Sequence, residues 1–317
     1  MTTLLELREN LKNFYNKYEI YITPVLKFLL ALVSFVTINL NVGYMSKLSN
    51  PIIILVVALM CSFLPTSFIL LISSVYIVMN FYALSLECAV VALCLFLVLF
   101  LLYFRFTPKD ALVVLLLPIA FALKIPYVVV LAAGLVGTPV SAVAATCGVI
   151  VYYLIQFVSV NANTIASLEA DNAIGKFRFV VDGMMNNKQM LVMIVAFAIT
   201  ILVVYLLRRM SVDHAWTIAV VVGCVTNVVI LLIGDLMFDT TTSVIGVIIG
   251  MVVSFGLCKV LEFFVFNVDY TRTEYVQFED DEYYYYVKAI PKNSVAKSKK
   301  TVKKITSVID YRDSLGK

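Results

Sequence analysis

The feature that most constrains this chain is a succession of apolar runs that covers it from about Ile20 to Phe264, with only short polar interruptions. A helix needs about 20 apolar residues to cross the hydrocarbon core of a bilayer, and several of these runs reach that length. Charged residues make up only 14% of the sequence, whereas soluble domains carry about a quarter. The pattern therefore predicts an all-α polytopic integral membrane protein, whose first partner is the lipid bilayer.

Two of the apolar runs are broken by proline. Residues 51–82 are interrupted at Pro65, and residues 111–136 are interrupted at Pro118 and Pro126. We interpret each run as a pair of helices hinged at proline, and the second pair as a re-entrant hairpin with Lys124 at its tip. This interpretation gives about eight transmembrane helices plus the hairpin. The six uninterrupted spans are expected at 20–45, 86–104, 142–160, 190–207, 216–234 and 242–264.

The two broken runs are each followed by one long helix, which suggests a possible inverted repeat of 51–106 and 111–158. Three elements per segment turn the second copy upside down, an arrangement common in transporters. The alternative is that two proline-broken apolar runs look alike through composition alone.

Lysine and arginine predict the orientation, because short loops rich in these residues stay in the cytoplasm. The tail after Phe264 and the pair Arg208-Arg209 are basic, so we expect both of them inside. The transmembrane domain, 20–264, then lies between a cytoplasmic amphipathic segment, 1–19, and a cytoplasmic tail, 265–317. The loop at 168–189 is expected outside. The prediction is a multi-pass protein of the cell (inner) membrane with both termini cytoplasmic.

The tail contains two further predicted elements. Tyrosine- and valine-rich stretches flank the acidic residues 279–282, which predicts a β-hairpin over 273–290. A basic helix is expected over 295–310, where lysines are attracted to anionic lipid headgroups. Nucleic acid is the alternative ligand, and we expect none because the membrane surface accounts for the charge. The membrane-surface lysines are Lys297, Lys299, Lys300, Lys303 and Lys304.

Proline and polar residues inside the spans are the candidates for a substrate pathway, because freed backbone groups and polar side chains are tolerated in lipid only when they face the bundle interior. Lys124 could pair with Glu87, or it could reach the membrane surface from the hairpin tip without a function. Ser73, Ser74 and Gln156 could line the same interior; as an alternative, such residues join helices without touching a substrate. The full set of pathway candidates is Pro65, Glu87, Pro118, Lys124, Pro126, Gln156 and Asn227.

The last span carries Gly246, Gly250 and Ser254 at intervals of four residues. Small residues at this spacing allow another helix to approach closely. We expect a packing face here, within the bundle or between subunits of a homo-oligomer.

Motifs of catalysis and cofactor binding are missing from the sequence. It contains no GxxxxGK[ST] phosphate loop, no HExxH and no GxSxG. The six cysteines form no CxxC pair, and the one histidine, His214, lies in a loop. We therefore expect no catalytic residue, no metal, no cofactor and no enzymatic activity.

Three stretches, RRMSVDHAW at 208–216, GKFRFVVDGM at 175–184 and VQFEDDEYYYYVKAIPK at 276–292, resemble a bacterial family of multi-spanning proteins often labelled ABC-transporter permease. The resemblance implies a permease-like component of a transport system, driven by a separate ATPase or an ion gradient, and it transfers no functional residues. The alternative is a membrane anchor or scaffold that recruits a cytosolic protein through the tail.

Overall fold

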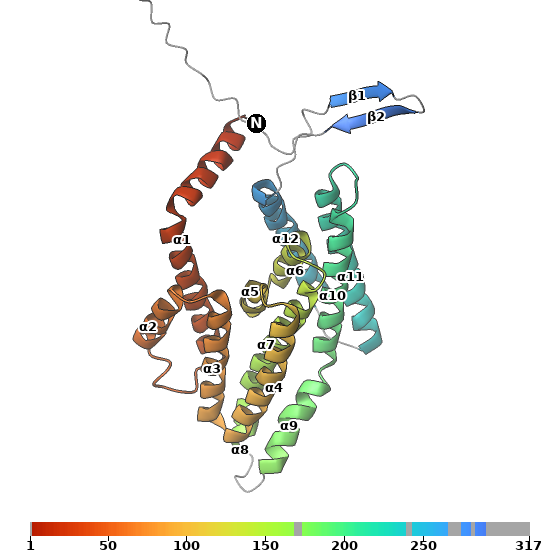
Figure 1. Cartoon of the computed structure of the whole chain (residues 1–317). Helices are drawn as coiled ribbons and strands as arrows, with labels where there is room; N and C mark the ends of the chain where they lie inside the picture. The colour runs from red at the N-terminus through yellow and green to blue at the C-terminus, as the bar shows by residue number, and fades with distance from the viewer. Residues whose placement is uncertain (1, 168–172, 239–242, 266–273, 280–282, 290–317) are drawn as a thin grey trace, which may run out of the picture. The chain divides into compact units, whose positions relative to one another are not determined.

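The structure, a computed structural model, describes residues 2–167, 173–238, 243–265, 274–279 and 283–289 of the 317-residue chain (Figure 1). The chain divides into two compact units. The first, Lys17–Val265, is called the membrane unit below. The second comprises residues 1–16 and 266–317.

The described residues fold almost entirely into helices. Their bounds are α1 Thr2–Val42, α2 Pro51–Ser62, α3 Thr66–Leu84, α4 Leu86–Phe106, α5 Ala111–Ala122, α6 Pro126–Val136, α7 Ser141–Val160, α8 Ala162–Ser167, α9 Ala173–Met185, α10 Lys188–Arg208, α11 Ala215–Phe238 and α12 Val244–Val265.

Among the described residues, seven helices are long and apolar enough to cross a membrane: α1, α3, α4, α7, α10, α11 and α12. The prediction of an all-α, multi-pass membrane protein is confirmed at this level. Each of the six uninterrupted spans expected from the sequence overlaps one of these helices, although 20–45 runs three residues past the end of α1 and 242–264 begins two residues before α12; α3 is the seventh. The shorter apolar helices are α2, α5 and α6, at 12, 12 and 11 residues. Such helices are roughly 18 Å long, against about 30 Å of hydrocarbon.

The first helix is irregular where the sequence predicts the boundary between the amphipathic segment and the first span. Tyr18 has non-helical backbone angles, φ −114° and ψ 20°, inside an otherwise continuous helix. The predicted boundary at residues 19 and 20 lies directly after it.

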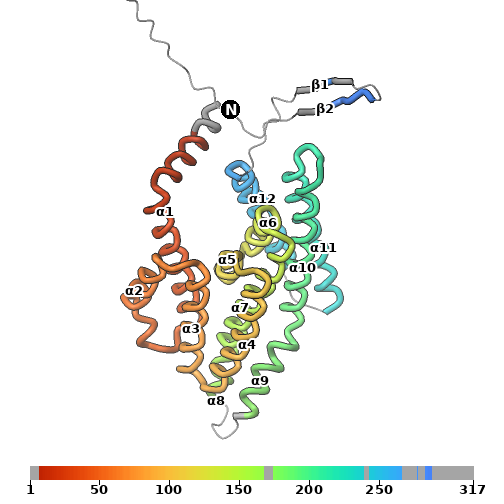
Figure 2. The backbone as a smooth tube through the Cα atoms, viewed as in Figure 1, coloured from red at the N-terminus to blue at the C-terminus, as the bar shows by residue number. Residues whose placement is uncertain are grey.

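The centre of the membrane unit is α7, which packs against α4, α5, α6, α9 and α10 (Figure 2). Its most apolar stretch is 56% buried, whereas the corresponding stretches of α1 and α12 are each 28% buried. Small residues favour this position, since Ala144, Ala145 and Gly148 occupy little space between neighbouring helices.

The two segments compared as a possible inverted repeat share an order of elements but differ in dimensions. In each, a 12-residue helix precedes the middle helix, and a helix of about 20 residues follows it. The middle helix has 19 residues in α3 and only 11 in α6. The likeness therefore extends to the order of elements, while only the second segment contains a pair of short helices.

The predicted packing face on α12 contacts α6. A Cβ atom added to Gly250 would lie 2.8 Å from Cε2 of Tyr127 and 3.4 Å from the carbonyl oxygen of Lys124. Ser254 is fully buried, and its hydroxyl donates to Gly250 O at 2.6 Å. Gly246, by contrast, is exposed and has only Ser243 within 4 Å. The contact with α6 therefore uses Gly250 but not Gly246, and Ser254 is buried one turn further along α12.

In the second unit, the two strands expected in the tail are present as β1 Glu274–Glu279 and β2 Tyr284–Ala289 (Figure 1). They pair antiparallel, with Glu274 opposite Ala289 and Glu279 opposite Tyr284. The predicted basic helix over 295–310, with its five lysines, lies outside the described residues.

The contact at Gly250 generates a first prediction. Gly250→Ala would force the Tyr127 ring and α6 away from α12, so we expect the free energy of unfolding to fall by about 1–3 kcal/mol. Gly246→Ala is the matched control and should not lower stability, because its Cβ would meet only Ser243, at 3.5 and 3.6 Å, which is ordinary van der Waals contact. Thermal unfolding in detergent, followed by the reaction of the buried cysteines with a fluorogenic maleimide, measures both variants. Equal stability of the two variants would contradict the α6–α12 contact.

Candidate functional site

The site is built around the break between α5 and α6. Proline has no N–H, so Pro118 leaves the carbonyl of Val114, one turn earlier, without its usual intrahelical partner. A Cβ atom added to Gly148 of α7 would lie 2.9 Å from Leu117 Cβ and 3.3 Å from Val114 O. The proline-containing turn of α5 therefore packs directly on the backbone of α7, where a larger side chain would not fit.

The turn that follows α5 closes its helix end with a Schellman motif. The amide of Ile125 donates to Ala120 O at 2.8 Å, and the amide of Lys124 donates to Phe121 O at 3.0 Å. Lys124 takes the left-handed position, φ 61°, that glycine usually occupies in this motif. A lysine there is strained by about 1 kcal/mol relative to glycine. Pro126 then begins α6 at a position that needs no N–H donor.

Side-chain hydrogen bonds also hold the start of α5 and the end of α6. Ser141 Oγ, at the start of α7, donates to Asp110 Oδ2, just before α5, at 2.7 Å. Arg208, at the end of α10, donates through Nη1 to Leu135 O and through Nη2 to Gly137 O, the latter at 2.7 Å. The guanidinium thus satisfies carbonyls at the end of α6, where the helix dipole is negative.

These contacts gather the end of α4, the start of α5, the end of α6, the start of α7 and the end of α10 at one end of the membrane unit. We call this the basic end, because cations concentrate in these helix ends and their connections. They are Arg105, Lys109, Arg208 and Arg209.

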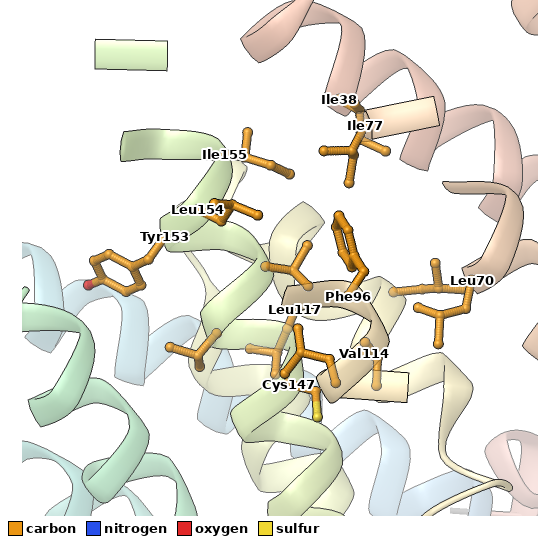
Figure 3. Close-up of a cluster of buried hydrophobic side chains, with 14 of the residues drawn as sticks. Ile38, Leu70, Ile77, Phe96, Val114, Leu117, Cys147, Tyr153, Leu154 and Ile155 are labelled. Carbon is orange, nitrogen blue, oxygen red and sulfur yellow. The ribbon is translucent and has the colours of Figure 1, made fainter. Parts of the chain in front are cut away.

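A cavity of about 90 Å³ lies beside the broken helix, between α1, α3, α4, α5 and α7. Figure 3 shows Ile77, Phe96 and Ile155, which come from α3, α4 and α7, pointing toward one another at its wall. Asn41 of α1 and Gln156 of α7 line the cavity and are exposed, so they mark its mouth. The volume is enough for several water molecules or one small organic molecule.

The cavity wall carries serine and threonine hydroxyls, the phenols of Tyr103 and Tyr152, the amides of Asn41 and Gln156 and the thiol of Cys147, set among apolar side chains. Ser34 Oγ donates to Leu30 O at 2.8 Å, and Ser74 Oγ donates to Leu71 O at 2.7 Å. Ser73, only 5% exposed, has a buried hydroxyl oxygen without a hydrogen-bond partner among the described residues. Buried polar atoms are usually paired, so this hydroxyl is available to hydrogen-bond a molecule that enters the cavity.

The cavity wall is electrically neutral, since none of its lining residues is an aspartate, glutamate, lysine, arginine or histidine. Beyond the mouth, the phenol of Tyr44 is hydrogen-bonded to Ser159, and burial raises the pKa of Tyr44 above its usual value. The phenol therefore stays protonated at physiological pH, and it adds no charge near the mouth.

The sequence-predicted residues fall into two groups. Pro118 and Gln156 line the cavity, together with Ser73 and Ser74, which the sequence placed in the same interior. The others lie elsewhere: Pro65 precedes α3, Lys124 and Pro126 form the α5–α6 turn, Glu87 is in the first turn of α4, and Asn227 is buried in α11.

The structure does not bring Glu87 and Lys124 together. Glu87 accepts a hydrogen bond from Ser85 Oγ, and the lysine that interacts with its charge is Lys176 of α9. The carbonyl of Lys124 lies against Gly250 of α12. No ion pair joins Glu87 to Lys124 in the part of the chain that the structure describes.

Asn227 joins two helices. Its Nδ2 donates to Thr200 Oγ1 of α10 at 3.0 Å, and Thr200 in turn donates to Ala196 O at 2.7 Å. Its Oδ1 is buried and has no partner among the described residues. This geometry matches the helix-joining role that the sequence left as the alternative.

Several residues of the site were missed by the sequence reasoning. Ser34, Thr37 and Asn41 form a polar stripe at helical spacing along α1, and that spacing was the available signal. Arg208 served only to predict the orientation, and Asp110 was not singled out. Lys259, which donates to Thr217 of α11 at 2.7 Å and pairs with Glu262 at 2.8 Å, gave no signal beyond being charged near a span end.

No group of histidine, cysteine or acidic side chains that could hold a metal ion occurs among the described residues, and the six cysteines are free thiols. Comparison with known protein families, curated proteins and solved structures gives no match to this chain.

The contact of Arg208 with α6 generates a second prediction. Arg208→Met leaves two carbonyls at the end of α6 without their charged donor, and we expect the free energy of unfolding to fall by about 2 kcal/mol. Arg209→Met is the control, since Arg209 is exposed and its side chain donates to Tyr205 Oη, four residues earlier on the same helix end, at 2.8 Å. Thermal unfolding in detergent compares the two variants. A larger loss from Arg209→Met than from Arg208→Met would contradict the assignment.

Proposed function

We propose that this protein is a permease-like membrane component of a transport system, and that its solute passes through the cavity between α1, α3, α4, α5 and α7. The observation that carries the proposal is the unpartnered, buried hydroxyl of Ser73, facing a cavity beside a proline-broken helix. Broken helices and buried polar groups at membrane depth are tolerated where they serve a cavity, and this combination is typical of transport proteins.

The chemistry proposed for this site is binding and release without bond making. The described residues offer hydroxyls, amides and apolar walls, and the sequence carries no nucleotide-binding loop. We therefore propose that the protein is not an enzyme, and that energy comes from a separate ATPase or from an ion gradient.

The proposed orientation places the basic end in the cytoplasm of a bacterial cell, because Arg105, Lys109, Arg208 and Arg209 lie there. Both termini are then cytoplasmic when α2 counts as an eighth crossing. The α5–α6 pair leaves the basic end and returns to it, which the bond between Asp110 and Ser141 supports. The tip contacts Gly250, about 9 Å along α12 from Val244, so it stops inside the bilayer.

The second candidate function is a membrane scaffold that recruits a cytosolic protein through the tail. The observation that favours it is the exposure of tyrosines on β2, where Tyr284 is 68% and Tyr286 is 78% exposed. Exposed aromatic side chains are common anchors of protein interfaces.

The re-entrant topology generates a third prediction. Single cysteines are placed at Lys109, Lys124 and Thr138 in a chain without its six native cysteines, and they are labelled from each side of the membrane. We expect positions 109 and 138 to react from the cytoplasmic side only. Position 124 should be shielded from that side, because the tip lies beyond the bilayer centre. Labelling of position 124 from the cytoplasm alone would contradict the topology.

The proposed pathway generates a fourth prediction, measured with a small uncharged methanethiosulfonate and an impermeant thiol on the far side to consume reagent that leaks across. A cysteine at Ser73 should react about tenfold faster than one at Ala31, because only the former faces the cavity while the latter lies in close-packed protein. Equal, slow rates at both positions would mean that water does not reach the cavity, and would favour the function as a membrane scaffold.

A further inference from the structure

We infer that the cavity binds an uncharged amphipathic molecule that carries at least one O–H or N–H group. This inference rests on the proposed function, because it names the class of solute that the same cavity would accept. Three properties of the wall support it: its charge, the direction of its hydrogen bonds and its apolar depth.

The absence of charged side chains from the wall disfavours ions. No aspartate, glutamate, lysine, arginine or histidine lines the cavity, so an ionic ligand would lose its hydration without gaining a counter-ion. Much of the wall is built from apolar side chains such as Leu70, Phe96 and Val114, which offer no compensating dipoles. A neutral ligand avoids this cost.

The hydrogen bonds of the wall favour a ligand that donates. The hydroxyls of Ser34, Thr37 and Ser74 donate hydrogen bonds to carbonyls of their own helices, at 2.8, 2.8 and 2.7 Å. Asn41 likewise donates through Nδ2 to Thr37 O at 2.7 Å. What the three hydroxyls still present is oxygen lone pairs, which accept hydrogen bonds, and Asn41 presents its Oδ1 together with its second N–H. A ligand hydroxyl or amine would supply the missing protons.

The hydroxyl of Ser73 is the position where such a group would be held. It is buried, it lines the cavity and it has no partner among the described residues, so it is free both to donate and to accept. A ligand O–H group likewise donates one hydrogen bond and accepts another, so the two hydroxyls can pair. The apolar side chains of α3, α4 and α5 would then surround the ligand's hydrocarbon part (Figure 3).

The mouth of the cavity lies between two helices rather than at the basic end. Asn41 and Gln156 are exposed and belong to the parts of α1 and α7 near their C-terminal ends, and α7 begins at the basic end. A molecule that partitions into the outer part of the bilayer would therefore reach the cavity from the side. An amphipathic molecule concentrates there, whereas a purely polar one does not.

The experiment is photolabelling of the full chain in lipid nanodiscs with an eight-carbon primary alcohol that carries a diazirine. Three competitors of matched length are compared at equal concentration in the bilayer: 1-octanol, octanoate and methyl octyl ether. The alcohol is neutral with a donor, octanoate is charged, and the ether is neutral without a donor. Labelled residues are identified by mass spectrometry.

We expect label on the cavity-lining segments of α3, α4 and α7, removed by 1-octanol about tenfold more effectively than by the ether or by octanoate. Ser73→Ala should abolish the preference for the alcohol over the ether. The matched control is Ser254→Ala, a buried serine of α12 outside the cavity, which should keep the preference.

Equal competition by all three compounds, or label confined to membrane-facing residues such as Leu101 and Val252, would overturn the inference. The proposed function and the ligand class can fail separately. If a cysteine at position 73 does not react with the aqueous reagent but 1-octanol competes best, the ligand class is supported and transport through the cavity is contradicted. If position 73 is accessible but the three competitors are equal, the ligand class falls.

Discussion

The membrane unit depends on one constraint, which is that backbone N–H and C=O groups in hydrocarbon need partners within the protein. The chain breaks its helices at α5–α6, and specific hydrogen bonds satisfy backbone groups at both ends of the break. The turn at Lys124 closes the end of α5 with two backbone hydrogen bonds. Arg208 reaches across from α10 to the last carbonyls of α6, and Ser141 fastens the start of α7 to Asp110.

The placement of α5 has a consequence for the space around it. Gly148 lets the proline turn of α5 lie directly on α7, and Pro118 then faces the cavity bounded by α1, α3 and α4. Two cations near helix ends have partners there: Arg208 donates to backbone carbonyls, and Lys259 forms an ion pair with Glu262. The polar groups of the cavity wall are hydroxyls, amides and the thiol of Cys147, all uncharged side chains. This separation suits a path for neutral molecules and is poorly suited to ions.

The sequence predicts the elements better than their contacts. Long apolar runs identify the spans because helix length must match bilayer thickness, and prolines identify the breaks because they remove donors. The interior position of Ser73, Ser74 and Gln156 follows from the cost of polar groups in lipid. The partner of Arg208 lies some 70 residues away, and no local period encodes such a contact. Glu87 and Lys124 looked complementary, yet Ser85 and α12 are their neighbours.

The lysine in the α5–α6 turn shows where sequence and structure inform each other. Charge alone suggested a partner or a surface position for Lys124, whereas the backbone places it in a left-handed conformation that glycine would adopt without strain. Strain of this kind is kept where the surrounding structure fixes it, and here α12 packs against the same turn at Gly250.

The central claim is that the cavity beside α5 is an occupied, ligand-accessible space in the membrane. The most direct measurement is a high-resolution electron cryo-microscopy structure in nanodiscs of native lipid. The account predicts non-protein density within hydrogen-bonding distance of Ser73 Oγ, bounded by Pro118 and Gln156. A structure in which α1 closes against α7 and side chains fill this space would contradict it.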